Sequence, residues 1–335
     1  MYVYYILLFL AALIFSLQFL ITKRYERKNG TGFLSSVRLS LFAYLTIALF
    51  FFVKGCITYR TLNFGFSWFT FALTLLIALV SLSCAYMGIK VLSVGNMGIY
   101  SVFMMLGSLV LPSLVGVVFY HEKMTLLKAA ALLCMFLAIV FSVSGADKKK
   151  FSGKAMLYYI GIFIMNGLIG VFFTVHQNKA EQTAAAIRMA DGTYAVNNDV
   201  FMTWYGLSTV IVCLLIYAAY FIYRAIRRRG DKAGEPPKTP QAETSAVKTS
   251  TAAVWLVSIA LAFCYGICNG LGDYFIALGT QPGALGSSVS FPIVNGGTIL
   301  FSTLSGVIFY KEKIRGWTIV SLVLVFVSTG LFLFV

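Results

Sequence analysis

An eleven-residue motif occurs twice in the chain. Residues 113–123 read SLVGVVFYHEK and residues 303–313 read TLSGVIFYKEK, so seven of eleven positions are identical at an offset of 190 (303 − 113). Chance similarity between apolar helices gives scattered Leu and Val matches. It rarely aligns a Gly, a Phe-Tyr pair and a Glu-Lys pair in one register. The two stretches therefore indicate an internal repeat.

The repeat belongs to a chain too apolar for a water-soluble fold. Of its 335 residues, 60% are hydrophobic and 11% are charged, whereas soluble domains are about 45–50% apolar and about 25% charged. Helices satisfy their backbone hydrogen bonds within one long apolar run, and the alternating strands of a membrane barrel are missing. The sequence predicts an all-α integral membrane protein.

Ten apolar segments have about the 20 residues that a bilayer crossing needs. They cover residues 2–22, 33–53, 67–88, 96–119, 125–144, 155–175, 200–222, 253–277, 283–309 and 315–335. Each repeat holds five of them, the first within 1–145 and the second within 155–335, which includes a flexible basic loop at 224–251. Because five is odd, the second copy must enter the membrane in the opposite orientation. We therefore expect ten transmembrane helices in two inverted five-helix repeats, a common plan in secondary transporters.

The loops between these segments differ in positive charge. Nineteen of the 26 Lys and Arg residues lie in the odd-numbered loops and six in the even-numbered loops, with Arg38 inside the second segment. The positive-inside rule then makes the odd loops cytoplasmic, which places both termini outside.

The repeated motif also carries a family resemblance. An apolar helix that ends in GVVFYHEKMT at 116–125, followed closely by another apolar helix, resembles the drug/metabolite transporter superfamily, EamA type. Arg38 near the start of the second segment and Ala85-Tyr86 near the end of the third also match. The resemblance implies two five-helix inverted repeats around a central cavity. It also implies transport of a metabolite, amino acid-like compound or drug across the cytoplasmic membrane by alternating access. Many members have cytoplasmic termini, so the orientation stays open.

Polar groups inside apolar helices are costly and usually face a cavity or the bundle interior. Asp273 is the one acidic residue clearly inside an apolar run, and Asn269 lies four residues before it on the same helix face. We expect both to bind the substrate, with Asp273 holding a cation or a coupling proton. The alternative is a paired structural carboxylate near the end of its helix.

Asn295 lies in FPIVNGG at 291–297. The Pro and the paired Gly predict a broken or kinked helix, which in transporters frees backbone groups for a ligand. Asn295 is therefore a candidate substrate-binding residue and Pro292 a candidate gating residue. The alternative is that the glycines only permit close helix packing, as we expect for Gly266 and Gly270.

Six other residues could also line the cavity or contact a substrate. Tyr100, Met104, Asn166, Trp204 and Tyr205 are candidates for the cavity wall, although Trp204 and Tyr205 equally suit an aromatic belt at the outer interface. Arg38 either pairs with a carboxylate or anionic substrate, or extends its charge to the interface.

Glu122 and Glu312 follow the two repeated helices, each directly before a Lys. A Glu at a helix C-terminus opposes the helix dipole. We therefore expect each Glu to cap the N-terminus of the next helix, with a role in gating as the alternative.

Several function classes are disfavoured. Two distant His residues and one buried Asp do not form a catalytic cluster, so we do not expect an enzyme. The six Cys show no metal-ligand spacing, and no metal or cofactor is expected. Despite the net charge of +15, nucleic acid is not expected, because the basic residues lie in short loops. The expected partners are a small-molecule substrate, the lipid bilayer, protons as a coupling ion and a second copy in a homodimer. The alternative function is a lipid-handling or scaffold protein without turnover.

Overall fold

The computed structural model describes residues 2–59, 65–94, 97–119, 124–144, 153–231, 251–280, 284–285, 287–312 and 316–334. These residues form ten α-helices: α1 (Tyr2–Asn29), α2 (Phe33–Tyr59), α3 (Trp68–Val94), α4 (Met97–Phe119), α5 (Leu126–Ser144), α6 (Gly153–Asn178), α7 (Asn198–Asp231), α8 (Thr251–Thr280), α9 (Ser287–Tyr310) and α10 (Gly316–Leu333). Eight of these described helices are long and apolar enough to cross a membrane, and α5 and α10 are shorter apolar helices. The chain is an all-α multi-pass membrane protein, as predicted.

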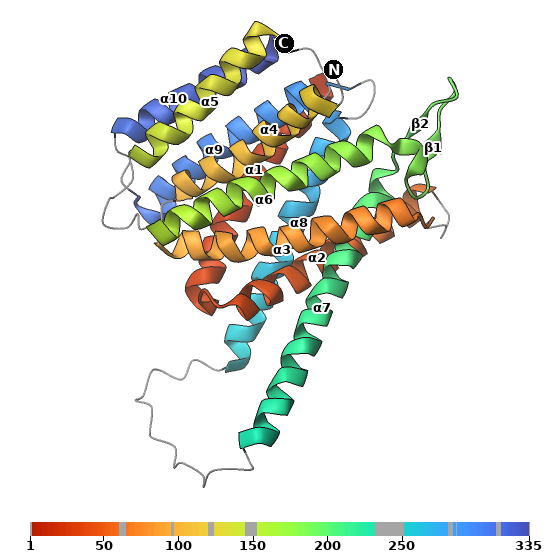
Figure 1. Ribbon diagram of the computed structural model, residues 1–335, viewed down its shortest axis with the longest axis vertical. Helices are drawn as coiled ribbons and strands as arrows, with labels where there is room; N and C mark the ends of the chain where they lie inside the picture. The colour runs from red at the N-terminus through yellow and green to blue at the C-terminus, as the bar shows by residue number, and fades with distance from the viewer. Residues whose placement is uncertain are drawn as a thin grey trace.

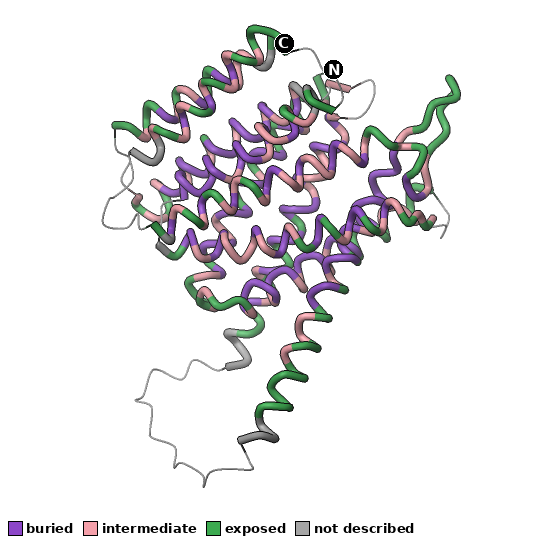
Figure 2. Tube along the Cα trace, in the orientation of Figure 1, coloured by how far each residue is buried: buried purple, intermediate pink, exposed green. Residues whose placement is uncertain are grey.

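The helices form one bundle with a paired edge (Figure 1). In the bundle, α1 packs on α8 and α9, α2 on α7 and α8, α6 on α3 and α4, α3 on α7, and α4 on α9. At the edge, α5 and α10 pack against each other and reach the bundle mainly through α4 and α9. Figure 2 shows buried residues concentrated where the bundle helices cross.

Most of the packed helix pairs are retained when the first five helices are exchanged with the last five; the exception is α1–α3, because α6 and α8 do not pack comparably in the described part of the chain. The pair α4–α6 becomes α9–α1, α3–α6 becomes α8–α1, and α2–α8 becomes α7–α3. The pairs α2–α7, α4–α9 and α5–α10 each become themselves. Each half therefore supplies equivalent packing surfaces to the other.

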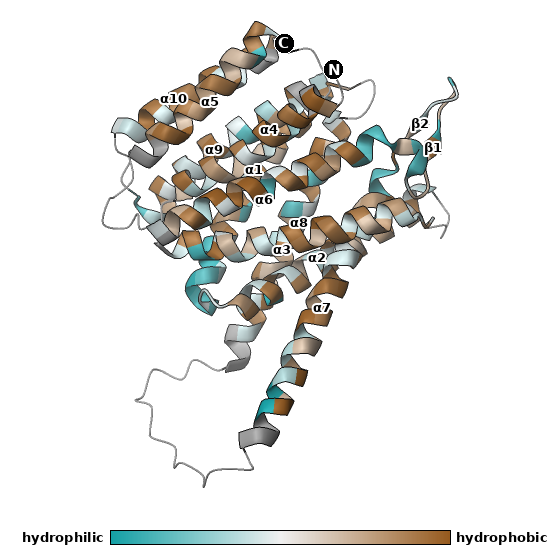
Figure 3. Cartoon of the chain, viewed as in Figure 1, coloured by the Kyte–Doolittle hydropathy of each residue, from teal (hydrophilic) through white to brown (hydrophobic). Residues whose placement is uncertain are grey.

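The loop predicted at 224–251 begins as helix rather than as a flexible linker. α7 continues to Asp231, and residues 232–250 lie outside the described part of the chain. Arg and Ala are good helix formers, and cations are favoured near a helix C-terminus. At 1.5 Å per residue α7 is about 51 Å long, longer than a hydrocarbon core of about 30 Å. It projects from the bundle in Figure 1, and its projecting end carries hydrophilic residues in Figure 3.

The connection between α6 and α7 holds the only described strands, which the all-α prediction did not include. A short 3-10 helix, η1 (Ala180–Gln182), precedes β1 (Ile187–Arg188) and β2 (Tyr194–Ala195), which pair antiparallel. In the turn between them, the Asp191 carboxylate accepts hydrogen bonds from the backbone N–H and the hydroxyl of Thr193. These hydrogen bonds lower the pKa of Asp191.

Glycines bring α2 into backbone contact with both of its neighbours. A β-carbon at Gly206 of α7 would lie 2.7 Å from the backbone nitrogen of Ala48, and one at Gly266 of α8 would overlap the backbone of Ala43. A β-carbon at Gly270 would lie 3.0 Å from Ile47. Close packing is therefore the role that the structure gives to Gly266 and Gly270.

Candidate functional site

A central cavity lies among α1–α4 and α6–α9, where side chains from all eight helices line it. Its volume, taken as the space that the centre of a water molecule can occupy, is about 90 Å³. A single water needs about 10–15 Å³ of such space. The cavity therefore has room for one small organic molecule or several waters.

A chain of polar side chains runs along one wall of the cavity. Gln18 of α1 donates its amide N–H to Asn269 Oδ1 at 2.9 Å, and Asn269 donates its own amide N–H to Asp273 Oδ2 at 3.0 Å. These bonds fix the orientation of the Asn269 amide between α1 and α8. The described residues form two ion pairs, Lys23–Glu312 and Lys54–Asp199. No Lys, Arg or His nitrogen of the described residues lies within 4.0 Å of the Asp273 carboxylate. Asp273 thus contributes a carboxylate without a cationic partner.

Hydroxyl groups hold together another part of the wall. Tyr205 of α7 bonds through its hydroxyl to the hydroxyls of Tyr44 and Ser81, each at 2.7 Å. Buried Tyr100 of α4 packs edge-on against Phe19, with ring centroids 5.0 Å apart. These contacts fix aromatic rings around the cavity.

Two asparagines line the cavity with different bonding. Asn166 of α6 donates to the backbone carbonyl of Met104 on α4 at 2.7 Å, so its N–H is used in joining two helices. Asn295 of α9 is 2% exposed, and its amide nitrogen Nδ2 has no hydrogen-bond partner among the described residues. A buried donor without a partner is costly, so Nδ2 is available to an occupant of the cavity. Met104 also lines the cavity.

Trp204 and Arg38 do not line the cavity. Trp204 donates its indole N–H to the carbonyl of Gly65 at 3.2 Å and packs against Phe66 near the α6–α7 connection. Arg38 donates to Asn29 Oδ1 at 2.7 Å and lies over the Trp255 ring at 4.5 Å. Arg38 therefore ties together the ends of α1, α2 and α8, outside the cavity.

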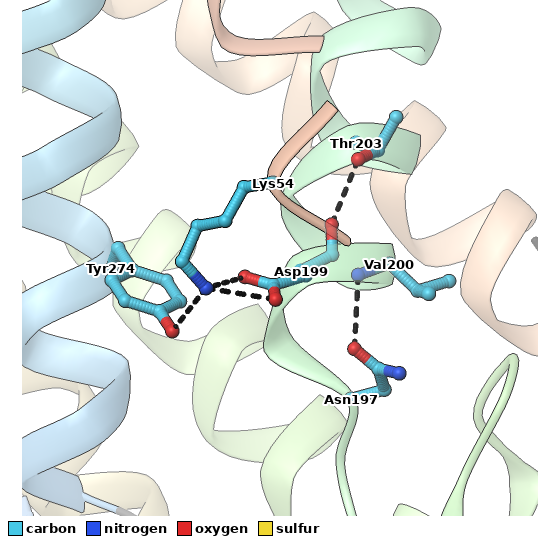
Figure 4. A network of polar contacts seen from close by, with 6 residues as sticks. All are labelled: Lys54, Asn197, Asp199, Val200, Thr203 and Tyr274. Carbon is cyan, nitrogen blue, oxygen red and sulfur yellow. Dashed lines mark hydrogen bonds and ion pairs between the residues drawn. The ribbon is translucent and has the colours of Figure 1, made fainter. Parts of the chain in front are cut away.

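One end of the bundle holds the Lys54 network, which consists of Lys54, Asp199 and Tyr274 (Figure 4). Lys54 of α2 donates to both carboxylate oxygens of Asp199 at 2.7 and 2.8 Å, and to the Tyr274 hydroxyl at 2.8 Å. Asn197 accepts the backbone N–H of Val200 and so caps α7. This cap places Asp199 in the first turn of α7, where the helix dipole favours a negative charge.

The opposite end holds the Glu312 network, which consists of Glu312, Lys23 and Met97. Lys23 of α1 pairs with the Glu312 carboxylate, which also accepts the backbone N–H of Met97 at 3.0 and 3.2 Å. Glu312 thus caps α4, whereas we expected it to cap α10, the helix that follows it. Lys311, with φ of 53°, ends α9 and turns Glu312 towards α4. Glu122 lies outside the described residues.

Of the predicted break or kink at Pro292, the break is not present, because α9 runs as one helix from Ser287 to Tyr310; the kink stays a prediction. The neighbouring glycines serve packing: a β-carbon at Gly297 would lie 2.8 Å from the Ala12 side chain, and one at Gly296 would overlap Thr329. Pro292 therefore lies within a continuous helix beside the cavity residue Phe291.

The structure adds cavity residues that sequence reasoning missed, namely Gln18, Tyr44, Ser81 and Tyr265. Gln18 had a usable signal, because it is a lone amide in the apolar run of α1 and polar groups in such runs usually face the interior. The tyrosines had none, since the chain holds 19 of them.

Comparisons with known proteins bear on the fold alone. No family model matches the sequence, and no curated protein matches it. A solved structure described only as "Crystal structure of protein" aligns with a TM-score of 0.59 at 15% sequence identity. The alignment covers 98% of this chain and 95% of the other. The chain therefore shares the fold of that protein over almost its whole length.

Proposed function

We propose that this protein is a secondary transporter of the EamA type, which moves a small organic molecule across the cytoplasmic membrane by alternating access. The observation that carries the proposal is the central cavity, which lies where the two halves of the chain meet and contains a carboxylate without a cationic partner. Binding sites at the interface between repeats are characteristic of secondary transporters.

The inverted-repeat arrangement is part of the proposal. The repeated motif ending at Lys123 and Lys313 supports it, and so does the retention of most helix pairs when the halves are exchanged. Two copies of one unit in opposite orientations can adopt two conformations and exchange them. That exchange opens a central cavity first to one side and then to the other.

The two charged networks support the same mechanism, because each adjoins the cavity at a different end. Thr22 lines the cavity and directly precedes Lys23 of the Glu312 network, while Asp273 lines it and directly precedes Tyr274 of the Lys54 network. Hydrogen bonds from Tyr25 to Ser35 and from Arg38 to Asn29 join the end of α1 to the start of α2. Lys23 therefore lies beside the start of α2, whereas Lys54 lies near the other end of that helix. Alternate opening of the two networks would connect the cavity to one side at a time.

Asp273 is the proposed coupling group. Among the described residues it is the only Asp, Glu, Lys, Arg or His that lines the cavity, so protonation of its carboxylate removes the formal charge of the wall. Proton binding there would alter the cavity's affinity for a charged substrate, which is the requirement for coupling.

Proteoliposomes that contain a pH-sensitive dye test the proposal. A panel of amines, amino acids, nucleosides and vitamins is added outside, and uptake and internal pH are followed. We expect at least one compound to be taken up together with proton movement by the wild type and by Asp191→Asn, a control in the exposed turn. We expect Asp273→Asn to lose the proton movement. Equal proton movement by Asp273→Asn would contradict the coupling role, and no uptake of any compound would contradict the transport function.

A further inference from the structure

We infer that the cavity binds a small organic cation, with the Asp273 carboxylate as its counter-charge and aromatic rings as its wall. The inference rests on the proposed transport function, because it names the substrate class of the same cavity.

The cavity wall is formally negative. Asp273 is the only carboxylate that the described part of the chain contributes to it. The two lysines next to the cavity ends are already paired, Lys23 with Glu312 and Lys54 with Asp199. Arg38 is held between Asn29 and Trp255 outside the cavity. A charged group away from bulk water needs a partner of opposite charge, and no described cation supplies one to Asp273. A cationic ligand would supply the positive charge that Asp273 lacks.

The rest of the wall suits a cation with apolar substituents. Seven aromatic side chains line the cavity: Phe15, Tyr44, Tyr100, Phe173, Tyr205, Tyr265 and Phe291. Aromatic ring faces attract cations and are used to recognise ammonium ligands. An inorganic cation would instead require several oxygen ligands. Among the described residues, no group of three or more His, Cys, Asp and Glu is placed to hold a metal ion.

A hydrogen-bond donor complements the carboxylate. Asn295 Nδ2 is buried and has no partner among the described residues, and it lines the same cavity as Asp273. A ligand with an oxygen acceptor beside its cationic group would satisfy both residues. The volume of about 90 Å³ for water centres restricts that ligand to a small molecule.

Choline is a suitable probe, because it has a compact quaternary ammonium group and a hydroxyl. Its neutral isostere, 3,3-dimethylbutan-1-ol, has the same shape without the charge. Binding of each to the full chain purified in detergent is measured by titration calorimetry at alkaline pH. Interactions with a charged group are stronger than interactions between neutral groups. We therefore expect choline to bind at least about tenfold more tightly than the isostere. Equal affinities, or no choline binding up to its solubility limit, would overturn the inference without reference to any variant.

Variants then locate the charge. We expect Asp273→Asn to weaken choline binding at least about tenfold while leaving the weak binding of the neutral isostere unchanged, since only the charge is removed. Asp191→Asn should bind both as the wild type does. Unchanged choline binding by Asp273→Asn would overturn the assignment of the counter-charge.

Uptake by proteoliposomes separates this inference from the transport function. Uptake of a neutral or anionic compound, together with absence of choline binding, would leave the transporter standing and overturn the cation site. Choline binding that depends on Asp273, with no uptake of any compound, would support the cation site and overturn transport.

Discussion

The Lys54 network offers a sharp test of the energetics, because its two charges are unequally buried. Asp199 has a side chain that is 3% exposed, whereas the Lys54 side chain is 32% exposed. Replacement of Lys54 by Met leaves a buried carboxylate without its cation. Replacement of Asp199 by Asn leaves an ammonium group that water still reaches and that still donates to Tyr274. We therefore predict that Lys54→Met destabilises the protein more than Asp199→Asn.

The magnitudes follow from this asymmetry. Removal of one partner of a buried ion pair costs about 3–5 kcal/mol. The dipole of α7 partly stabilises the orphaned carboxylate, so we expect about 3 kcal/mol for Lys54→Met. For Asp199→Asn we expect about 1–2 kcal/mol, close to the value of one charge-assisted hydrogen bond. The double variant should be more stable than Lys54→Met alone, because it leaves no buried charge.

The free energy of unfolding is measured by denaturation with sodium dodecyl sulfate in mixed micelles. Lys28→Met, which removes an exposed lysine at the end of α1, serves as the control and should change stability by less than about 0.5 kcal/mol. The reasoning is refuted if Asp199→Asn costs as much as Lys54→Met, or if the double variant is the least stable of the three.

Three further changes test the packing and the second network with the same denaturation assay. Gly107→Ala places a β-carbon on the backbone of the neighbouring helix α6 and should cost about 2–3 kcal/mol, whereas Gly153→Ala meets no atom within 4 Å and should be nearly neutral; equal effects would contradict the close α4–α6 packing. Glu312→Gln leaves the buried ammonium of Lys23 without its counter-charge, for an expected loss of about 3 kcal/mol, and a loss below about 1 kcal/mol would show that water solvates this pair. Tyr205→Phe removes the hydroxyl that joins α2 and α3 and should cost about 1–3 kcal/mol, and a neutral result would show that the partner hydroxyls find other acceptors.

The positions of the helices were predictable from the sequence, but several of their ends were not. The length of an apolar run matches the thickness of the hydrocarbon core. Such runs therefore locate the membrane-spanning part of a helix, but they do not show where the helix continues into water. α1 extends past the predicted end at 22 to Asn29, and α7 extends past 222 to Asp231. Both extensions are rich in Lys and Arg, which favour helix and complement the C-terminal dipole.

The candidate site was only partly predictable. The spacing along one helix shows which of its residues share a face, but it does not show which residues of other helices they contact. The spacing of Asn269 and Asp273 placed both on one face, and both line the cavity. Their partner Gln18 is 251 residues from Asn269 in the sequence, and no local pattern connects them. Trp204 and Tyr205 differ by about 100° around α7. The choice between them depends on helix rotation, and Tyr205 is the one that lines the cavity.

Charged residues at helix ends were the hardest to interpret. Glu312 caps α4, whose first residue is 215 positions away in the sequence. Lys54 and Asp199 lie in different halves of the chain. Each of these contacts exists only once the two halves have packed against each other.

Accessibility of Cys84 tests alternating access most directly, because this native cysteine lines the cavity. In a variant with the other five cysteines replaced by Ser (6 − 1), right-side-out and inside-out vesicles are treated with a membrane-impermeant thiol reagent. The account predicts that Cys84 is labelled from each side, and that choline slows labelling from both. Labelling from one side only, or from neither, would contradict a cavity that opens alternately across the membrane.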